Sequence, residues 1–208
     1  MALALAASLA TVLLPPASVG AAPAGYPVTG VDVSHLPFLV LDADRFVLES
    51  HLARANTQWR GIANGSQVKA VFHGPNAYIS PSWYQARPYV PTWNYLSLHV
   101  TGSIEFIHEP ADIIENLHRT IAFYEAAYGD QWDPGPSAEY IERIVRGVVA
   151  FKLNVETWDM AAKLSQDKDA EIQHRVVAAL KGTGRTQDLA VAELIEIENH
   201  HATTRSPS

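Results

Sequence analysis

The sequence contains no cysteine among its 208 residues. This excludes a disulfide framework, thiolate metal sites and cysteine nucleophiles, but it does not indicate a compartment. Basic residues are also few, since 15 Lys and Arg stand against 22 Asp and Glu, which gives a formal charge of −7. Binding to duplex DNA depends largely on Lys and Arg side chains that neutralise phosphates. The composition therefore argues against direct nucleic-acid binding.

Long hydrophobic runs are absent too, and the apolar N-terminal stretch is too short to span a bilayer as a helix. Its length allows a secretory signal peptide over residues 1–21, with VGA as a small-residue cleavage site. No Lys or Arg precedes the run, which argues against a signal peptide. The alternative is a buried first strand, SLATVLL, followed by a Pro/Gly/Ala-rich loop over residues 15–30. The two interpretations predict a secreted and a cytoplasmic protein, respectively.

Short apolar or alternating runs, typical of β-strands, fill much of the remaining chain. The predicted strands are 37–41, 45–50, 67–73, 94–108 and 148–158. A turn at residues 42–44 joins the first two, and Gly102 marks a bulge or bend of the kind that curls a sheet into a barrel. With 48% hydrophobic residues, the chain can bury one sizeable core. These strands predict a small closed sheet.

Helical spacing predicts four helices. One begins at Pro110 and ends before Gly129, and another begins at Ser137. The second is expected to turn the side chains of Tyr140, Ile141, Ile144 and Val145 inward. Residues 170–180 and 189–199 predict a helical hairpin, whose second helix carries glutamates where a DNA-reading helix needs basic and amide residues.

Two polar and aromatic clusters are candidate binding regions. The sequence FHGPNAYISPSWY, residues 72–84, begins an aromatic-rich stretch that reaches His99 and is stiffened by prolines, which predicts a rigid loop. Planar groups on a stiff backbone suit a flat ligand, because stacking adds about 0.5–1.5 kcal/mol per pair and a rigid loop loses little entropy on binding. A packed loop at one end of a barrel, or an oligomer interface, accounts equally well for this composition.

The second cluster, ESHLARANTQWRG at residues 49–61, joins a strand end to a short helix or turn. It offers free backbone N–H groups and an arginine, Arg54, whose fork can hold two phosphate oxygens. Ser34 and His35 precede a strand that pairs with the one entering this cluster, so both segments can contribute to one binding face. Alternatively, these residues only cap a surface helix.

Five motifs in one order carry a family resemblance: SHLPF, HLARANTQW, FHGPNAYISPSWY, VPTWNYLSLHVTG and KLSQD. They resemble the PaiB family of FMN-binding negative transcriptional regulators, over most of the chain. The resemblance implies an α+β fold that is mainly β: a split β-barrel with flanking helices and a C-terminal helical hairpin. It places SLATVL at the first barrel strand, which favours a cytoplasmic protein. The implied organisation is a split-barrel FMN-binding domain over 1–166, a hairpin packed on the barrel over 167–201, and a disordered tail over 202–208.

The same resemblance implies a homodimer that binds FMN, a small planar ligand, at the subunit interface. It implies no membrane association, no catalytic residue and no metal ligand. Carried over by motif, the contacts along the isoalloxazine are Ser34, His35, Leu36 and Pro37. The contacts at the phosphate end are His51, Arg54, Ala55 and Asn56. Further contacts come from Trp93 and Asn94, in either subunit, and from Lys163, Ser165 and Gln166.

The last motif departs from the family pattern, which reads KLSQN. This chain has Asp167 in place of the asparagine, and Ala150-Phe151 in place of a Gly-Phe pair. A carboxylate that faced a phosphate would lower the affinity for FMN by like-charge repulsion.

Three functions follow as hypotheses. The first is a flavin-binding negative regulator of transcription that acts indirectly, through a partner or a small molecule. The second is an FMN-dependent oxidoreductase of the flavin-reductase or pyridoxamine-phosphate-oxidase type, in which the cofactor carries the hydride chemistry. The third is a haem-binding split barrel, which ranks last because a lone histidine is more often a hydrogen-bonded structural residue than a ligand. Its candidate ligands are His35, His51, His73 and His99.

Overall fold

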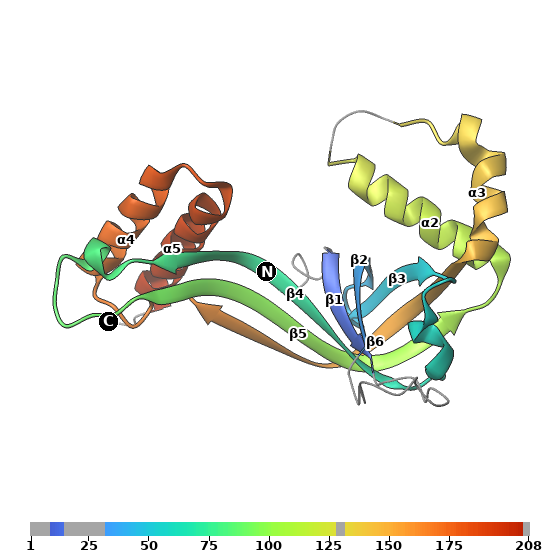
Figure 1. Ribbon diagram of the computed structural model, residues 1–208, viewed down its shortest axis with the longest axis horizontal. Helices are drawn as coiled ribbons and strands as arrows, with labels where there is room; N and C mark the ends of the chain where they lie inside the picture. The colour runs from blue at the N-terminus through green and yellow to red at the C-terminus, as the bar shows by residue number, and fades with distance from the viewer. Residues whose placement is uncertain (1–8, 15–31, 128–131, 206–208) are drawn as a thin grey trace, which may run out of the picture. The chain divides into compact units, whose positions relative to one another are not determined.

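The computed structural model describes residues 9–14, 32–127 and 132–205, with side chains from residue 32 to residue 200. These residues form two compact units (Figure 1). The barrel unit draws on residues 1–72 and 99–159, and the hairpin unit draws on residues 73–98 and 160–208. Three long strands change unit partway along their length, between Phe72 and His73, between Leu98 and His99, and between Asp159 and Met160.

Six strands form a closed barrel in the order β1-β2-β3-β6-β5-β4. Their bounds are β1 Leu9–Leu14, β2 Asp32–Asp42, β3 Val47–Ala53, β4 Gln67–Ile79, β5 Thr92–Ile107 and β6 Val148–Lys163. Strand β1 closes the barrel because it pairs antiparallel with both β2 and β4. The first strand predicted within SLATVLL is therefore confirmed.

Buried aromatic rings fill the core of the barrel unit. Phe38 of β2 makes edge-on contacts with Phe72 of β4 and Phe151 of β6, at centroid distances of 5.5 and 5.9 Å. All three side chains are at most 2% exposed. The predicted turn at 42–44 is confirmed, because Asp42 Oδ1 accepts hydrogen bonds from the backbone N–H groups of Asp44 and Arg45.

Two helices accompany the barrel strands, α2 at Pro110–Glu125 and α3 at Ala138–Ile144. Ile113 and Leu117 of α2 pack with Ile141 and Val145 in one buried cluster. The prediction that Tyr140 and Ile144 also turn inward is wrong, since these side chains are 54% and 39% exposed. Helix α3 has only seven residues, so a single stripe, one turn from Ile141 to Val145, reaches the core.

The hairpin unit contains residues 73–79 of β4, 92–98 of β5 and 160–163 of β6. It also contains helices α4 (Ala170–Thr183) and α5 (Thr186–Arg205) (Figure 1). The predicted helical hairpin is confirmed, and its cap residues explain the bounds of α4. Asp169 accepts a hydrogen bond from Ile172 N, and Gly184 ends the helix at a φ of 67°. Of the tail expected at 202–208, residues up to Arg205 belong to α5, and 206–208 lie outside the described residues.

The loop predicted for residues 72–84 is wrong, because β4 continues to Ile79 and a short 3-10 turn, Pro81–Tyr84, follows. Buried Ala77 and Ile79 alternate with exposed neighbours, as a half-buried strand requires. The loop was predicted partly because of Pro75, since proline usually interrupts a strand. This proline lies beyond Phe72, the last residue of β4 that pairs with β1, and a strand without a partner on one side tolerates proline.

The described residues contain three 3-10 turns besides Pro81–Tyr84, namely Thr57–Gly61, Gly135–Ser137 and Val145–Gly147. Across the described ranges, no helix combines the length and the apolar character needed to cross a membrane.

Gly102 is required by a close approach of strands rather than by a turn. A Cβ atom at this position would lie 2.1 Å from the backbone oxygen of Asn154 in β6.

We expect Gly102→Ala to lower the free energy of unfolding by about 3 kcal/mol or more, because the clash is with backbone. Urea denaturation measures the change. Gly182→Ala is the matched control, since its added Cβ meets nothing within 4 Å, and it should stabilise α4 by about 0.5–1 kcal/mol. Equal stability of the two variants would contradict the close approach.

Candidate functional site

The candidate residues divide between the two units, so each group is described within its own unit. In the barrel unit, Ser34 and Asn56 belong to a small polar network. Asn56 Nδ2 donates to Ser34 Oγ at 2.7 Å, and Ser34 Oγ donates to Gln58 Oε1 at 2.5 Å. Asn56 also caps the 3-10 turn through Oδ1, which accepts from Gln58 N. The turn predicted after HLARAN is confirmed, and Gln58 Nε2 is a buried donor without a partner among the described residues.

Arg54 is held in place by backbone carbonyl groups. Its Nε donates to Arg146 O at 2.8 Å and its Nη2 donates to Val148 O at 2.9 Å. The guanidinium carbon lies 5.4 Å from the centroid of the Trp59 ring. Both hydrogen-bond partners are neutral, so the positive charge of Arg54 is oriented without being cancelled.

His51 faces helix α2. Its Nδ1 lies 3.0 Å from Oδ1 of Asn116, a fully buried residue of α2. Two residues earlier on β3, buried Glu49 binds Arg119 of α2 through two hydrogen bonds of 2.7 and 2.8 Å. Burial lowers the pKa of His51, although the hydrogen bond to Asn116 and the negative charge of Glu49 oppose this shift.

The remaining barrel-unit candidates differ in how far their side chains are exposed. Ser34 and Leu36 are buried on β2, whereas His35 between them is exposed and Pro37 is half-buried. Ala55 is exposed and follows Arg54. The structure therefore places His35 on the opposite face of β2 from Ser34 and Leu36.

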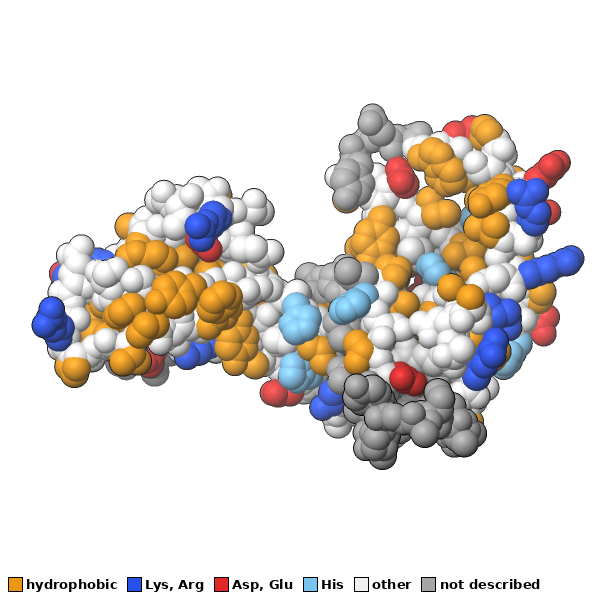
Figure 2. All heavy atoms as spheres, viewed as in Figure 1, with side chains coloured by type: hydrophobic (Ala, Val, Ile, Leu, Met, Phe, Trp, Pro, Cys, Tyr) orange, Lys and Arg blue, Asp and Glu red, His pale blue; other side chains and the backbone are white. Residues whose placement is uncertain are grey.

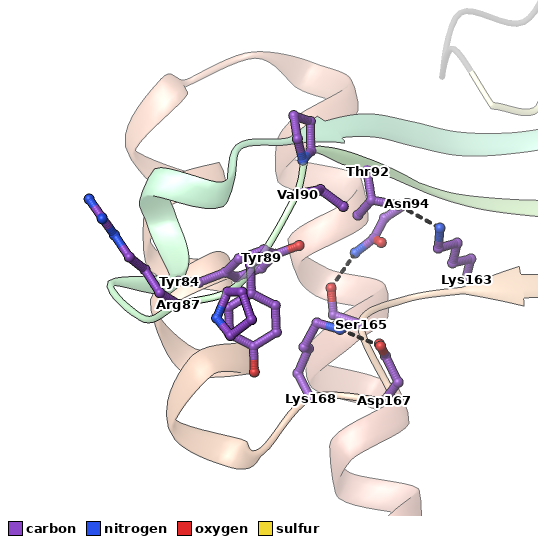
Figure 3. A pocket seen from close by; sticks show the side chains of 12 residues that line it. Tyr84, Arg87, Tyr89, Val90, Thr92, Asn94, Lys163, Ser165, Asp167 and Lys168 are labelled. Atoms are coloured by element: carbon purple, nitrogen blue, oxygen red, sulfur yellow. Dashed lines mark hydrogen bonds and ion pairs between the residues drawn. The ribbon is translucent and has the colours of Figure 1, made fainter.

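The hairpin unit contains a cavity of about 610 Å³, between the β4–β5 connection and the end of β6. Figure 3 shows its lining side chains, which include three predicted contacts, Asn94, Lys163 and Ser165. Asn94 is fully buried, and its Nδ2 donates to Ser165 Oγ at 2.8 Å. Its Oδ1 is buried and has no hydrogen-bond partner among the described residues. Such an acceptor is expensive to leave unpaired, so it marks a position where a ligand donor fits.

Basic side chains dominate the charge of this cavity. Arg87, Lys163 and Lys168 line it with one acid, Asp167. Lys168 forms an ion pair with Asp167, and this hydrogen bond is the main cause of the lowered pKa of the Asp167 carboxyl group. Lys163 Nζ donates to Thr92 Oγ1 at 2.5 Å, a neutral partner. The departure from the KLSQN motif is thus accompanied by a neighbouring cation that offsets the added negative charge.

Gln166 and Trp93 lie away from this cavity. Gln166 turns back onto its own backbone, where Oε1 accepts from Leu164 N and Nε2 donates to Ala162 O. Trp93 precedes Asn94 on β5 and points to the opposite face, where its Nε1 donates to Asn76 Oδ1 at 3.3 Å. There it lines a separate cavity of about 480 Å³ with Tyr78 and other residues.

Two basic lining residues, Arg87 and Lys168, were not predicted from the sequence. Tyr84 and Tyr89 belong to the aromatic-rich stretch that was a candidate binding region, and they provide an aromatic wall with ring centroids 4.8 Å apart. Lys168 Nζ lies 5.2 Å from the Tyr89 ring. Lys168 could have been found, because it lies directly next to the KLSQD motif. Arg87 offered no comparable signal, since it stands alone in an irregular connection.

The comparisons with known proteins agree with this architecture. Residues 6–157 match the family model described as "Putative FMN-binding domain". The chain belongs to this family. The protease synthase and sporulation protein PAI 2 of Bacillus subtilis (strain 168) is 34% identical over 155 residues, which cover 74% of this chain and 73% of that protein. The predicted resemblance to the PaiB family is thereby confirmed, and by this resemblance the cofactor is FMN.

Two solved structures share the fold. The FAD and heme binding protein from Mycobacterium smegmatis aligns with a TM-score of 0.51 at 17% identity, covering 85% of this chain and 74% of that one. The flavocytochrome Anf3 from Azotobacter vinelandii gives 0.52 at 13% identity, covering 83% and 70%. With the closed barrel, these similarities confirm the predicted split-barrel fold of the FMN-binding family.

The environment of His51 predicts a pH dependence of stability. Because burial lowers the folded-state pKa below the ordinary 6.5, the unfolded chain binds the proton more tightly. The free energy of unfolding should therefore fall as pH drops below about 6.5, and His51→Gln should reduce this slope. Urea denaturation at several pH values between 5 and 8 measures it. His118→Gln, an exposed histidine of α2, is the control and should keep the wild-type slope. An unchanged slope in His51→Gln would contradict the assignment.

Proposed function

We propose that the cavity of the hairpin unit binds FMN, and that the protein is a flavin-binding negative regulator of transcription that acts through a partner. The observation that carries the cofactor proposal is the buried Oδ1 of Asn94, which has no partner in the described chain. It can accept a hydrogen bond from an N–H of the flavin or an O–H of its ribityl chain. Ser165 fixes the orientation of this amide through the Asn94 Nδ2 group.

The charge and size of the cavity fit the same ligand. Among the described residues, Arg87 and Lys163 have no carboxylate partner within 4.0 Å and so provide positive charge for a phosphate, while Lys168 is paired with Asp167. Tyr84 and Tyr89 offer ring surface for an aromatic group. A volume of about 610 Å³ falls in the range of about 300–1,000 Å³ that small-molecule and cofactor sites occupy. When bound, FMN supplies redox chemistry.

The barrel unit offers an alternative group of FMN contacts, separate from the hairpin-unit cavity. Arg54 is pre-oriented by two carbonyl groups and keeps its charge, which suits a phosphate. Asn56 and Ser34 hold each other in a fixed geometry. His51, His35, Leu36, Pro37 and Ala55 complete this group, whereas Trp93 and Gln166 lie away from the hairpin-unit cavity and are left out of the proposed contacts.

A homodimer is also part of the proposal. Figure 2 shows apolar side chains gathered over the visible face of the hairpin unit. Its exposed residues include Val90, Trp93 and Tyr95, with exposed fractions of 75%, 50% and 37%. Exposed aromatic and aliphatic side chains of this kind favour an interface between copies of the chain. Light scattering during chromatography measures the mass in solution.

FMN binding can be tested through quenching of flavin fluorescence. We expect saturable binding, and we expect Lys163→Gln to weaken it by about 1.5–3 kcal/mol, the range for a hydrogen bond to a charged group. Asn94→Leu should weaken it as well, because it removes the free acceptor while nearly preserving volume. Lys69→Gln is the matched control, since Lys69 is exposed on β4 and lines neither cavity described above. Binding that none of these variants changes would place FMN elsewhere, and absence of binding would refute the flavoprotein function.

Indirect regulation makes a separate prediction about DNA. At about 50 mM salt, where electrostatic binding is favoured, a random-sequence 30-base-pair duplex should show no mobility shift with micromolar protein. The reason is the formal charge of −7. A shift that weakens steeply with added salt would instead establish direct phosphate contacts and contradict a partner-mediated role.

A further inference from the structure

A second cavity, in the barrel unit, is lined by cations and apolar side chains. It has a volume of about 310 Å³ and lies between the 3-10 turn Thr57–Gly61 and the end of β5. Arg54, Arg60 and His108 face it, over a floor that includes buried Ile62 and Val149. None of its lining residues is Asp or Glu, although acidic residues outnumber basic ones in the chain by 22 to 15.

The two guanidinium groups of this cavity carry uncompensated charge. Within the described ranges, neither Arg54 nor Arg60 has a carboxylate oxygen within 4.0 Å. Their guanidinium carbons lie 5.4 and 5.9 Å from the centroid of the same ring, that of Trp59. Trp59 is itself fixed, because its Nε1 donates to Arg54 O at 3.0 Å. Two like charges therefore lie near one aromatic ring and line one cavity, where a bound anion would be attracted to both.

The apolar part of the lining adds a second requirement on the ligand. Phe106 and Ile107 of β5 border the cavity together with Ile62 and Val149. A bare inorganic anion would leave this surface wet, whereas an aromatic or aliphatic body would cover it. The volume lies at the lower end of the range for small-molecule sites, half that of the cavity in the hairpin unit.

We propose that this cavity binds a second ligand, distinct from FMN: a single-ring organic anion whose phosphate or carboxylate group is held by Arg54 and Arg60. The ring lies against the apolar lining, and His108 adds a hydrogen-bond donor at the rim. Arg60 and His108 belong to no FMN contact proposed above, and Arg54 belongs only to the alternative barrel-unit group, so this inference rests on FMN occupying the hairpin-unit cavity, which shares no residue with this one.

The test uses isothermal titration calorimetry of the full chain with phenyl phosphate, benzoate and, as the neutral probe, benzyl alcohol. We expect the two anions to bind and benzyl alcohol not to bind. Arg60→Gln should weaken anion binding about tenfold or more, because one of the two charged contacts is lost. Lys69→Gln, which removes one positive charge outside the cavity, should change it less than twofold. Circular dichroism checks that each variant is folded.

Three results would overturn the inference. Absence of binding of either anion at millimolar concentration excludes the site, and an equal loss in Lys69→Gln reduces the effect to net charge. The third result comes from repeating the titration with FMN-saturated protein. Retained phenyl phosphate binding supports a second ligand, whereas competition overturns the inference because it makes the cavity part of the flavin site. If the chain binds no FMN at all, the titration with phenyl phosphate still decides the inference by itself.

Discussion

The alternation of buried and exposed side chains along β5 determines which residues of this strand each unit buries. Every even-numbered residue from Asn94 to Ile104 is buried, across the point between Leu98 and His99 where the strand passes from one unit to the other. A shift of pairing by one residue would turn this whole set to solvent. The same alternation places Asn94 in the cavity and Trp93 on the opposite face. Gly102 continues the buried series at a point where the backbone of β6 approaches closely.

Periodicity predicted the elements better than it predicted their surroundings. The strands, the turn after Asp42 and the helical hairpin follow from spacing, caps and turn residues that lie close together in the sequence. The continuation of β4 past Pro75 does not, because it depends on where β1 stops pairing, and β1 is some sixty residues earlier. Likewise, Tyr140 fits the helical period, but the short α3 offers the core only one stripe.

The candidate site shows the same limit. Sequence motifs named Asn94, Lys163 and Ser165, and the structure brings them together in one cavity. They also named Trp93 and Gln166, which lie outside this cavity. The motifs included them because motif order carries no information on which face a strand residue occupies. The partners of Arg54 are carbonyl groups of residues 146 and 148, about ninety positions away, and no local pattern announces a backbone acceptor. The sequence partly indicated the charge balance of the hairpin-unit cavity, since Lys168 directly follows Asp167.

Helix α2 is fixed to β3 by two polar contacts, whose spacing follows the repeat of a strand on β3 and the repeat of a helix on α2. Glu49 and His51 are two residues apart on the strand, and their partners Arg119 and Asn116 are three residues apart on the helix. A helix that slid along the strand would have to break both contacts and leave the carboxylate of Glu49, 1% exposed, without its counter-ion inside the protein. Purely apolar packing would tolerate several neighbouring positions with similar energy. Here the two polar contacts select one position of the helix, and sliding of α2 along β3 would have to break both of them at once.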